Sequence, residues 1–242
     1  MNISSISMFL DPTDKVIVFI GGGGKSTLIH RLSKDFSSAG QTVAVISVYP
    51  SIIPMEANTL IAKDIRNLKS QIKQELKSTP VIYIGKQLEN ERLDPYKSIE
   101  ISQMIKSGLP VDRLLIEADA TSGKSVSGYS RLTISYPADR CINIMGADAF
   151  NKPFENAWIK SRDPFWSKRD MLTPMNLEEW MESREIFEKI RKKGIPLTFF
   201  LNKVENIFTQ NLAHSFGKKI RQTVFDRVII GSVFNSQFQL IE

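Results

Sequence analysis

The sequence of 242 residues has few of the side chains that build disulfides or soft-metal sites. It contains one cysteine, Cys141, which excludes an internal disulfide framework and any four-cysteine metal site. The two histidines, His30 and His214, both fall in segments with helical spacing and are interpreted as ordinary helix residues. A histidine–cysteine metal centre is therefore not expected.

Long hydrophobic runs are also missing. No stretch approaches the ~20 apolar residues of a membrane-spanning helix, and residues 1–10 lack the basic start and long apolar core of a signal peptide. We therefore expect a cytoplasmic protein without a membrane partner. A hydrophobic content of 42% supports a true core, and the length suits one large domain or two small ones.

The net charge of +6 and the isoelectric point near 9.3 raise the question of nucleic-acid binding. Basic residues gather at positions 168–169, 191–193 and 218–221. Acidic residues are interleaved with them, and the clusters fall in helical patterns, where such charges usually form a solvated face. We therefore do not expect a nucleic-acid partner. The positive charge instead favours anionic ligands such as nucleotides.

A glycine-rich stretch joins a predicted strand to a predicted helix. The five residues 16–20 are apolar and mostly β-branched, as is typical of a buried strand. The loop after them consists of Gly21, Gly22, Gly23, Gly24, Lys25, Ser26 and Thr27. Glycines let consecutive N–H groups turn toward one anion, and the helix start adds partial positive charge. These residues predict a phosphate-binding loop, in which Lys25 reaches the β- and γ-phosphates of a nucleotide and Ser26 binds Mg²⁺.

The loop departs from the full phosphate-loop pattern, G-x-x-x-x-G-K-[ST], at its first position. Phe19 stands where that pattern has a glycine. We therefore expect a tighter loop than usual. The alternative is a plain glycine turn between a strand and a helix, but such a turn has no need of Lys25, Ser26 and Thr27 at the helix start.

The rest of the chain alternates predicted strands and helices. Strands are expected at 42–48, 79–85, 112–119, 140–145, 197–201 and 228–233, and helices at 25–39, 58–77, 98–107, 175–193 and 210–224. Two prolines in 49–54 predict a loop there. This order indicates an α/β protein with a P-loop NTPase-like three-layer fold and a mainly parallel sheet. We expect one nucleotide-binding domain over residues 1–242, with its ligand at the carboxyl ends of the strands.

Two acids end the predicted strand at 112–119. Glu117 and Asp119 are two residues apart and are expected to point the same way, toward the edge that carries the glycine loop. A carboxylate there suits Mg²⁺ binding, directly or through water, or orientation of an attacking water. We expect Asp119 as a metal ligand and Lys25, Asp119 and Glu117 as the catalytic group. The sequence does not separate the roles of the two acids, and exposed acids at a strand end are the alternative.

Asn202, Lys203 and Glu205 follow the predicted strand at 197–201 and resemble the Asn-Lys-x-Asp base-recognition motif of GTP-binding proteins. In that motif the asparagine orients the loop, the lysine stem stacks on the base, and the acid accepts hydrogen bonds from guanine. Here the acid is one methylene longer. An ordinary polar loop is the alternative. Asp148, after the predicted strand at 140–145, is expected to cap the next segment rather than to touch ligand.

Four short segments, at 21–27, 115–119, 146–150 and 201–205, resemble in that order the accessory family for selenium-dependent molybdenum hydroxylases. The resemblance extends from about residue 16 to residue 233. It implies a P-loop nucleotide-binding fold and a role in the maturation of enzymes such as xanthine dehydrogenase. The family is also described as selenium cofactor biosynthesis proteins.

The chain differs from that family pattern at two places. After the second predicted strand, a threonine-rich stretch is replaced at residues 47–50, where Ser47 is the one aliphatic hydroxyl. After the acidic strand, Asp-Gly-Ser and Pro-Leu-Lys runs are replaced at residues 119–121 and 125–127. We expect a Mg²⁺-dependent protein that binds and hydrolyses GTP or ATP and assists selenium or molybdenum cofactor insertion into a molybdenum hydroxylase. The alternatives are a small-molecule kinase, with its acceptor held by residues 122–137, and a nucleotide-binding module without turnover.

Overall fold

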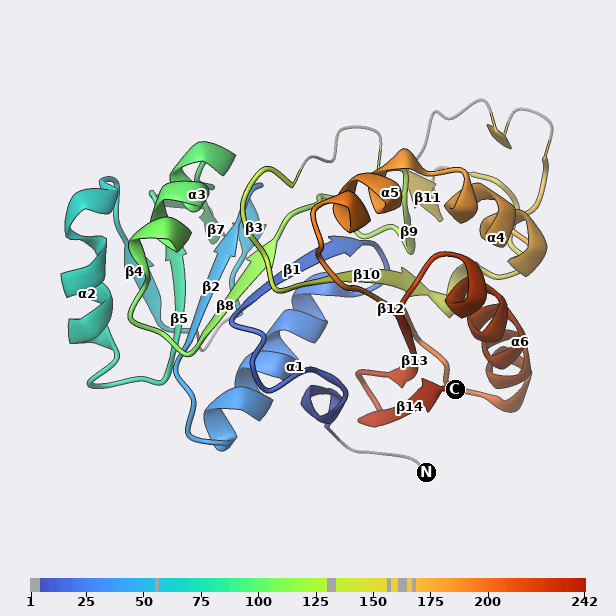
Figure 1. Ribbon diagram of the computed structural model, residues 1–242, viewed down its shortest axis with the longest axis horizontal. Helices are drawn as coiled ribbons and strands as arrows, with labels where there is room; N and C mark the ends of the chain where they lie inside the picture. Colours follow the sequence, from blue (N-terminus) through green and yellow to red (C-terminus); the bar gives the residue numbers. More distant parts are fainter. Residues whose placement is uncertain (1–4, 55–56, 130–133, 156–157, 161–164, 167–168) are drawn as a thin grey trace.

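The computed structural model describes residues 5–54, 57–129, 134–155, 158–160, 165–166 and 169–242. Nine strands in this part of the chain form one sheet in the order β14-β13-β12-β10-β1-β8-β2-β5-β4 (Figure 1). Their bounds are β1 (Val16–Gly21), β2 (Val43–Ser47), β4 (Thr59–Ile61), β5 (Val81–Gly85), β8 (Arg113–Glu117), β10 (Arg140–Gly146), β12 (Leu197–Asn202), β13 (Arg227–Ser232) and β14 (Gln237–Ile241). Every pair of neighbours is parallel except β13 and β14.

Helices cover both faces of this sheet, as the α/β prediction required. One face carries α1 (Lys25–Ser38) and the short 3-10 helix η1 (Ile6–Phe9) (Figure 1). The other face carries α2 (Leu68–Glu75), α3 (Ser98–Ser107), α4 (Pro174–Glu182), α5 (Glu185–Lys192) and α6 (Ile207–Thr223). The three-layer, mainly parallel α/β fold is therefore confirmed.

The central strand β1 is buried on both faces, which explains its unbroken apolar sequence. Because successive strand residues point to opposite faces, its residues divide between two cores. Val16, Val18 and Ile20 pack under the larger group of helices, whereas Ile17 and Phe19 pack against α1 and η1. Phe19 is completely buried, so the position that holds glycine in other phosphate loops here belongs to the strand and its core.

The carboxyl ends of four neighbouring strands meet at one edge of the sheet. They are the ends of β8, β1, β10 and β12, at Glu117, Gly21, Gly146 and Asn202. The crossover from β8 to β10 passes over β1, so β1 stands where the chain changes sides of the sheet. Parallel α/β sheets bind their ligands at such a point.

Two predicted helices differ from the structure. The first part of the segment 58–77 forms the edge strand β4 and the 3-10 helix η2 (Ile65–Asn67), and helix begins only at Leu68. Pairing with β5 overrides the helical pattern, since two of the three β4 residues are β-branched. The segment 175–193 is broken at Ser183, whose hydroxyl donates to the carbonyl of Trp180 at 2.7 Å. Such a bond competes with continuation of the helix.

Short strands outside the main sheet were not predicted. β3 (Ser51–Ile52) lies between the two prolines that predicted a loop, and it pairs with β7 (Arg92–Leu93), which pairs with β6 (Leu88–Glu89). A second small pair joins β9 (Val126–Ser127) and β11 (Ile159–Lys160). The 3-10 helix η3 (Ala147–Ala149) follows β10. The sheet β3-β7-β6 contributes to the site described below.

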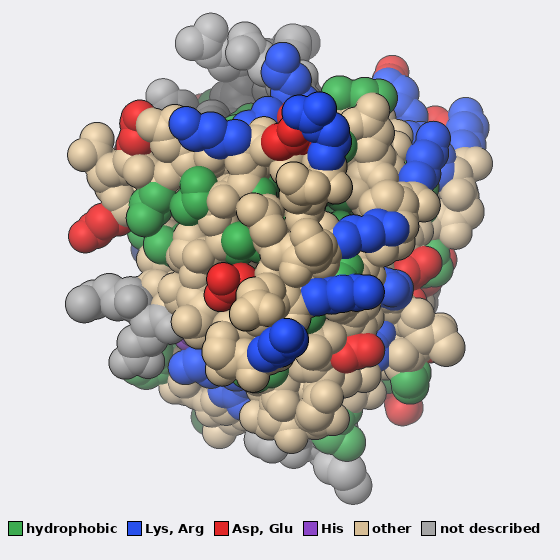
Figure 2. Space-filling view, turned by 90° about the vertical axis from the view of Figure 1, so that its left-hand side faces the viewer, with side chains coloured by type: hydrophobic (Ala, Val, Ile, Leu, Met, Phe, Trp, Pro, Cys, Tyr) green, Lys and Arg blue, Asp and Glu red, His purple; other side chains and the backbone are tan. Residues whose placement is uncertain are grey.

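Charges on the helices are interspersed rather than of one sign. Figure 2 shows lysine and arginine side chains with carboxylates between them at the α2 end of the molecule. On α5, Lys189 and Lys192 pair with Glu185 and Glu188 at 2.7 and 2.6 Å. None of the helices in the described ranges is long and apolar enough to span a membrane.

Candidate nucleotide-binding site

The phosphate loop, residues 21–27, is fitted tightly against the end of β10. Gly21 and Gly23 have positive φ angles of 95° and 74°. A Cβ atom on Gly21 would lie 2.1 Å from the carbonyl oxygen of Ile144, and one on Gly23 would lie 2.2 Å from the backbone nitrogen of Gly146. Both the backbone conformation and the close approach therefore require glycine at these positions.

Two amide groups of this loop are already used inside the protein. The N–H of Gly22 donates to the carbonyl of Ile144 at 2.8 Å, and the N–H of Gly23 donates to the carbonyl of Lys124 at 2.8 Å. The Gly22 and Gly23 amides therefore do not form the expected anion-binding cradle, and the binding position moves toward the start of α1. The donors for an anion lie at the start of α1, where the first turn of a helix has no intrahelical acceptors.

Lys25 lies across the phosphate loop and is 5% exposed. Its ammonium group donates to the carbonyl of Gly21 at 2.6 Å and to the hydroxyl of Thr121 at 3.3 Å. A charged ammonium is buried at such a site only when several acceptors hold it. The predicted phosphate-binding lysine thus stands at the centre of the loop, and Thr121 is a contact that the sequence did not indicate.

Ser26 and Glu117 meet on the open side of the loop. The Ser26 hydroxyl donates to Oε1 of Glu117 at 3.0 Å. Burial raises the pKa of the Glu117 carboxyl, and the nearby Asp119 carboxylate raises it further, while Lys25 and the Ser26 bond lower it by less. A hydroxyl and a carboxylate are oxygen ligands of the kind that Mg²⁺ prefers, so this pair fits a magnesium ion.

Asp119 lies beyond the end of β8, so the alternation of strand residues does not place it as expected. Its Oδ2 atom accepts a hydrogen bond from the N–H of Gly21 at 3.3 Å and another from the hydroxyl of Ser127. Asp119 is therefore fixed against the first residue of the phosphate loop, whereas Glu117 contacts Ser26. Both acids still border the same cleft.

Asn202 connects the predicted base-recognition loop to the phosphate loop. Its side-chain amide donates to the carbonyl of Gly23 at 2.8 Å, and its Oδ1 accepts from the N–H of Val233 at 3.0 Å. The carboxylate of Glu205 accepts from the Ser232 hydroxyl at 3.0 Å. The loop after β12 and the turn after β13 are thus held together beside the phosphate loop.

Lys203 has a positive φ of 63°. Its ammonium group pairs with Asp148 at 2.7 Å and contacts the hydroxyl of Ser125 at 3.3 Å. Asp148 lies within η3, and its Oδ2 accepts from this lysine. Its expected role as a cap is therefore wrong.

A cleft of about 500 Å³ opens beside the phosphate loop. Its lining includes residues at the phosphate loop and nearby strand ends: Gly23, Gly24, Lys25, Ser26, Thr27, Ser47, Glu117 and Asp119. The rest of the lining consists of residues 49–52, Arg92 and residues 120–124. The sequence predicted no role for Arg92, because no local motif marks the hairpin that carries it, whereas residues 122–124 fall in the segment expected to hold an acceptor in the kinase alternative.

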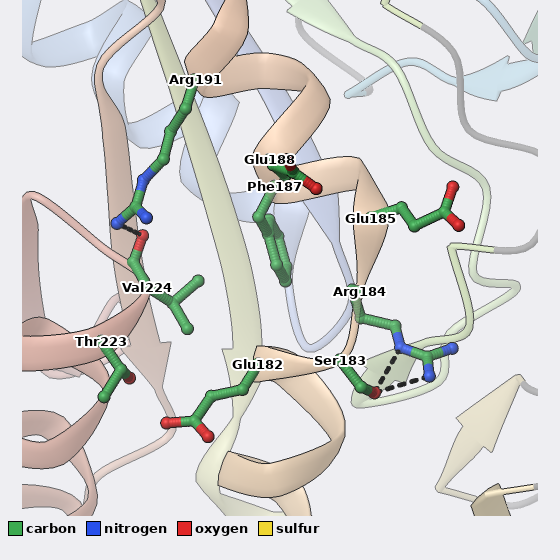
Figure 3. A pocket seen from close by; sticks show the side chains of 9 residues that line it. All are labelled: Glu182, Ser183, Arg184, Glu185, Phe187, Glu188, Arg191, Thr223 and Val224. Atoms are coloured by element: carbon green, nitrogen blue, oxygen red, sulfur yellow. Dashed lines mark hydrogen bonds between the residues drawn. The ribbon is translucent and has the colours of Figure 1, made fainter.

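A second hollow, of about 590 Å³, lies between the α4–α5 corner and the end of α6 (Figure 3). In it the Phe187 ring points inward, and the Arg191 guanidinium bonds the carbonyl of Val224. None of the described residues that line it belongs to the phosphate loop. We therefore assign the candidate site to the cleft beside Lys25.

Comparison with known proteins places the chain in a family. A family model described as YqeC protein matches residues 17–162. The chain belongs to the YqeC protein family. The matched region includes β1, the phosphate loop and both acids at the end of β8, and it ends before the Asn202 loop. YqeC membership and the P-loop arrangement together support a nucleotide-binding protein.

No curated protein matches this YqeC family member. Among solved structures, it is similar to the crystal structure of the signal recognition particle 54 kDa protein from Aeropyrum pernix K1 in complex with GDP. The identity is 8% and the TM-score is 0.42, over 96% of this chain and 46% of that one. The chain thus spans less than half the length of that protein.

The raised pKa of Glu117 gives a testable consequence for stability. Because the folded state favours protonated Glu117, the ionised carboxylate opposes folding above the raised pKa, and the penalty fades as pH falls toward the ordinary value of 4.5. We expect Glu117→Gln to raise the melting temperature at neutral pH, by about 2–4 °C per kcal/mol regained. Thermal unfolding without Mg²⁺, followed by circular dichroism from neutral to acidic pH, measures this difference.

Glu100→Gln is the matched control. Although burial raises it, hydrogen bonds from Lys86 and the Lys97 N–H hold the pKa of Glu100 below its usual range. Neutralising this carboxyl should therefore lower the melting temperature at neutral pH. A melting temperature of Glu117→Gln equal to or below that of the unaltered protein would contradict the electrostatic account of Glu117.

Proposed function

We propose that this protein binds a nucleoside triphosphate with Mg²⁺ at the phosphate loop and hydrolyses it. The observation that carries the proposal is the buried Lys25 at the start of α1, beside the paired Ser26 and Glu117. A helix start, a buried ammonium and two oxygen ligands match the negative charge of a triphosphate and its metal. An ordinary glycine turn needs none of them.

The proposed roles follow from the contacts. Lys25 contributes charge to the β- and γ-phosphates, and Ser26 and Glu117 hold Mg²⁺, which when bound neutralises phosphate charge. The contact with Ser26 favours Glu117 over Asp119 as the acid nearest the metal. Asp119, oriented by the Gly21 N–H and the Ser127 hydroxyl, is suited to orient the attacking water.

Lys25→Ala tests the phosphate loop directly. We expect the variant to remain folded but to lose affinity for triphosphates by roughly tenfold to a hundredfold, because a charged hydrogen-bond donor contributes about 1.5–3 kcal/mol. Titration calorimetry with Mg²⁺ and GTP or ATP measures the loss. Lys34→Ala, an exposed lysine on the same helix, is the control and should bind normally. Unchanged affinity of Lys25→Ala for every nucleotide would refute the site.

We further propose that the base is guanine. A carboxylate at Glu205 accepts hydrogen bonds from N1–H and N2–H₂ of guanine, whereas adenine presents an acceptor at N1. The bond from Ser232 holds one carboxylate oxygen and leaves acceptor capacity on the group. Asn202 supports the same interpretation, because it fixes this loop to the phosphate loop. The longer glutamate should make the preference weaker than that of an Asn-Lys-x-Asp protein.

Competition between GTP and ATP for one labelled nucleotide tests the base. We expect GTP to bind about tenfold to a hundredfold more tightly, the range for one unsatisfied buried polar group. Glu205→Asp should sharpen the preference and Glu205→Ala should remove it. Glu182→Ala, an exposed acid on α4, should leave it unchanged. Equal displacement by both nucleotides, unaffected by Glu205→Ala, would leave Glu205 without a role in base recognition.

The cellular role that we propose is assistance in selenium or molybdenum cofactor insertion into a molybdenum hydroxylase. Support comes from the ordered resemblance of four segments to the accessory family of selenium-dependent molybdenum hydroxylases and from the YqeC family match over residues 17–162. Nucleotide turnover at Lys25 would act as the switch or driving force for that insertion.

Deletion of the gene tests this role. We expect the strain to contain normal amounts of hydroxylase polypeptide but to lose most of its xanthine-dehydrogenase-type activity, because the enzyme lacks its complete cofactor. The unaltered gene should restore activity, and a gene encoding Lys25→Ala should not. Full hydroxylase activity in the deletion strain would exclude the role while leaving nucleotide binding intact.

A further inference from the structure

Part of the cleft beside the phosphate loop lies beyond the residues assigned to nucleotide and Mg²⁺. This part of the lining consists of residues 49–52, Arg92 and residues 120–124. The base-recognition residues Asn202, Lys203 and Glu205 do not line this cleft. The cleft therefore reaches beyond the phosphate loop to β3 and β7 of the small sheet, and the residues assigned to nucleotide and Mg²⁺ do not account for this half.

Arg92 is a cation in this part of the lining without a counterion. Its side chain makes no hydrogen bond or ion pair with any residue in the described ranges. Glu89 lies directly opposite Arg92 on β6 and would be its natural partner on the hairpin. The carboxylate of Glu89 instead accepts a hydrogen bond from the side-chain amide of Gln87.

The hairpin places Arg92 at a fixed position. Asn90 and Glu91 form the connection between β6 and β7 with positive φ angles of 47° and 63°, and such a conformation is strained for a glutamate. Leu93 is buried, and its Cδ2 lies 2.8 Å from where a Cβ on Gly85 would stand. Because neighbouring strand residues point to opposite sides, burial of Leu93 turns Arg92 toward the cleft.

Lys124 supplies a second positive charge from a different element. Its carbonyl accepts from the N–H of Gly23 at 2.8 Å, and its N–H donates to the carbonyl of Thr121 at 3.1 Å, so its backbone is anchored to the phosphate loop. Lys124 lines the cleft, and its side chain has no hydrogen-bond or ion-pair partner in the part of the chain that the structure describes.

Apolar residues line the same cleft as these two cations. They are Tyr49, Pro50 and Ile52, and Ile52 is 63% exposed even though it pairs with Arg92 across β3 and β7. An exposed isoleucine beside an unpaired arginine suits a ligand that has both an apolar body and an anionic group.

We propose that this half of the cleft, Tyr49–Ile52 with Arg92 and Lys124, binds a second small molecule that carries a carboxylate or phosphate group. Arg92 and Lys124 hold the anionic group, and Tyr49, Pro50 and Ile52 contact the apolar part. The inference rests on the proposed function, since it places this molecule beside the γ-phosphate of a bound triphosphate. The proposed second ligand belongs to the class of small organic or inorganic anions.

The test uses protein saturated with Mg²⁺ and the non-hydrolysable β,γ-imido analogue of GTP, so that the phosphate loop is filled. Equilibrium dialysis with radiolabelled inorganic phosphate, and separately with labelled benzoate, then measures binding of a second anion. We expect one equivalent of at least one probe to bind with a dissociation constant below about 1 mM. Arg92→Ala and Lys124→Ala should each weaken that binding about tenfold or more.

Lys73→Ala, an exposed lysine on α2, is the control and should bind the probe as the unaltered protein does. Preference for phosphate or for benzoate identifies which anionic group the site takes. Failure of both probes to bind, or binding that survives in the Arg92→Ala/Lys124→Ala double variant, would overturn the inference. The inference would also be overturned if, with no second anion present, these variants bound the triphosphate analogue more weakly but bound GDP normally. Arg92 and Lys124 would then contact the γ-phosphate itself.

The same titrations separate this inference from the proposed function. The affinity for the GTP analogue is measured first, and it should be unchanged in Arg92→Ala, Lys124→Ala and Lys73→Ala, because the proposed phosphate loop does not use these residues. Normal analogue binding with no second anion refutes only the second subsite. If neither this analogue nor the corresponding ATP analogue binds, the phosphate-loop assignment itself is refuted.

Discussion

The site depends on the close fit of the glycine loop against the carboxyl end of β10. The bond from the Gly22 N–H to Ile144, and the contacts that leave no room for a Cβ at Gly21 or Gly23, fix the path of the chain between β1 and α1. That path determines where α1 begins and therefore where its unpaired amides point. Lys25 follows from the same geometry, because its ammonium group rests on the carbonyl of Gly21. A small change at β10 would displace every one of these groups.

The charged groups around the phosphate loop are not all balanced by opposite charges within the protein. The buried Lys25 ammonium donates to the Gly21 carbonyl and the Thr121 hydroxyl, while Glu117 is held partly desolvated, with a raised pKa, beside Asp119. Such an arrangement costs stability in exchange for a prepared site. Arg92 and Lys124 add positive charge without a side-chain partner elsewhere in the cleft lining. A ligand with both anionic and metal-bound parts complements this distribution.

The sequence predicted the parts that local rules control. The buried strand at 16–20, the loop through Thr27 and the acids at 117 and 119 follow from apolar runs, glycines and strand ends, and the structure brings them to one edge. It could not predict the hairpin with Arg92, because two-residue strands carry no periodic signal and their pairing depends on distant residues. The helix expected at 58–77 failed for the same reason, since pairing with β5 decides its first part.

The site depends on Asn202, which lies outside the segment that matches the family model. The matched region ends at residue 162, yet the side chain that bonds the Gly23 carbonyl comes from β12, and β12 also pairs along the whole outer side of β10. A fragment ending at residue 162 would leave β10 as an exposed edge strand and the Gly23 carbonyl without its side-chain donor. Edge strands of this kind invite association with other chains. The segment that matches the family model is therefore not expected to be stable on its own, and minimal versions of the protein must retain the strands that follow it.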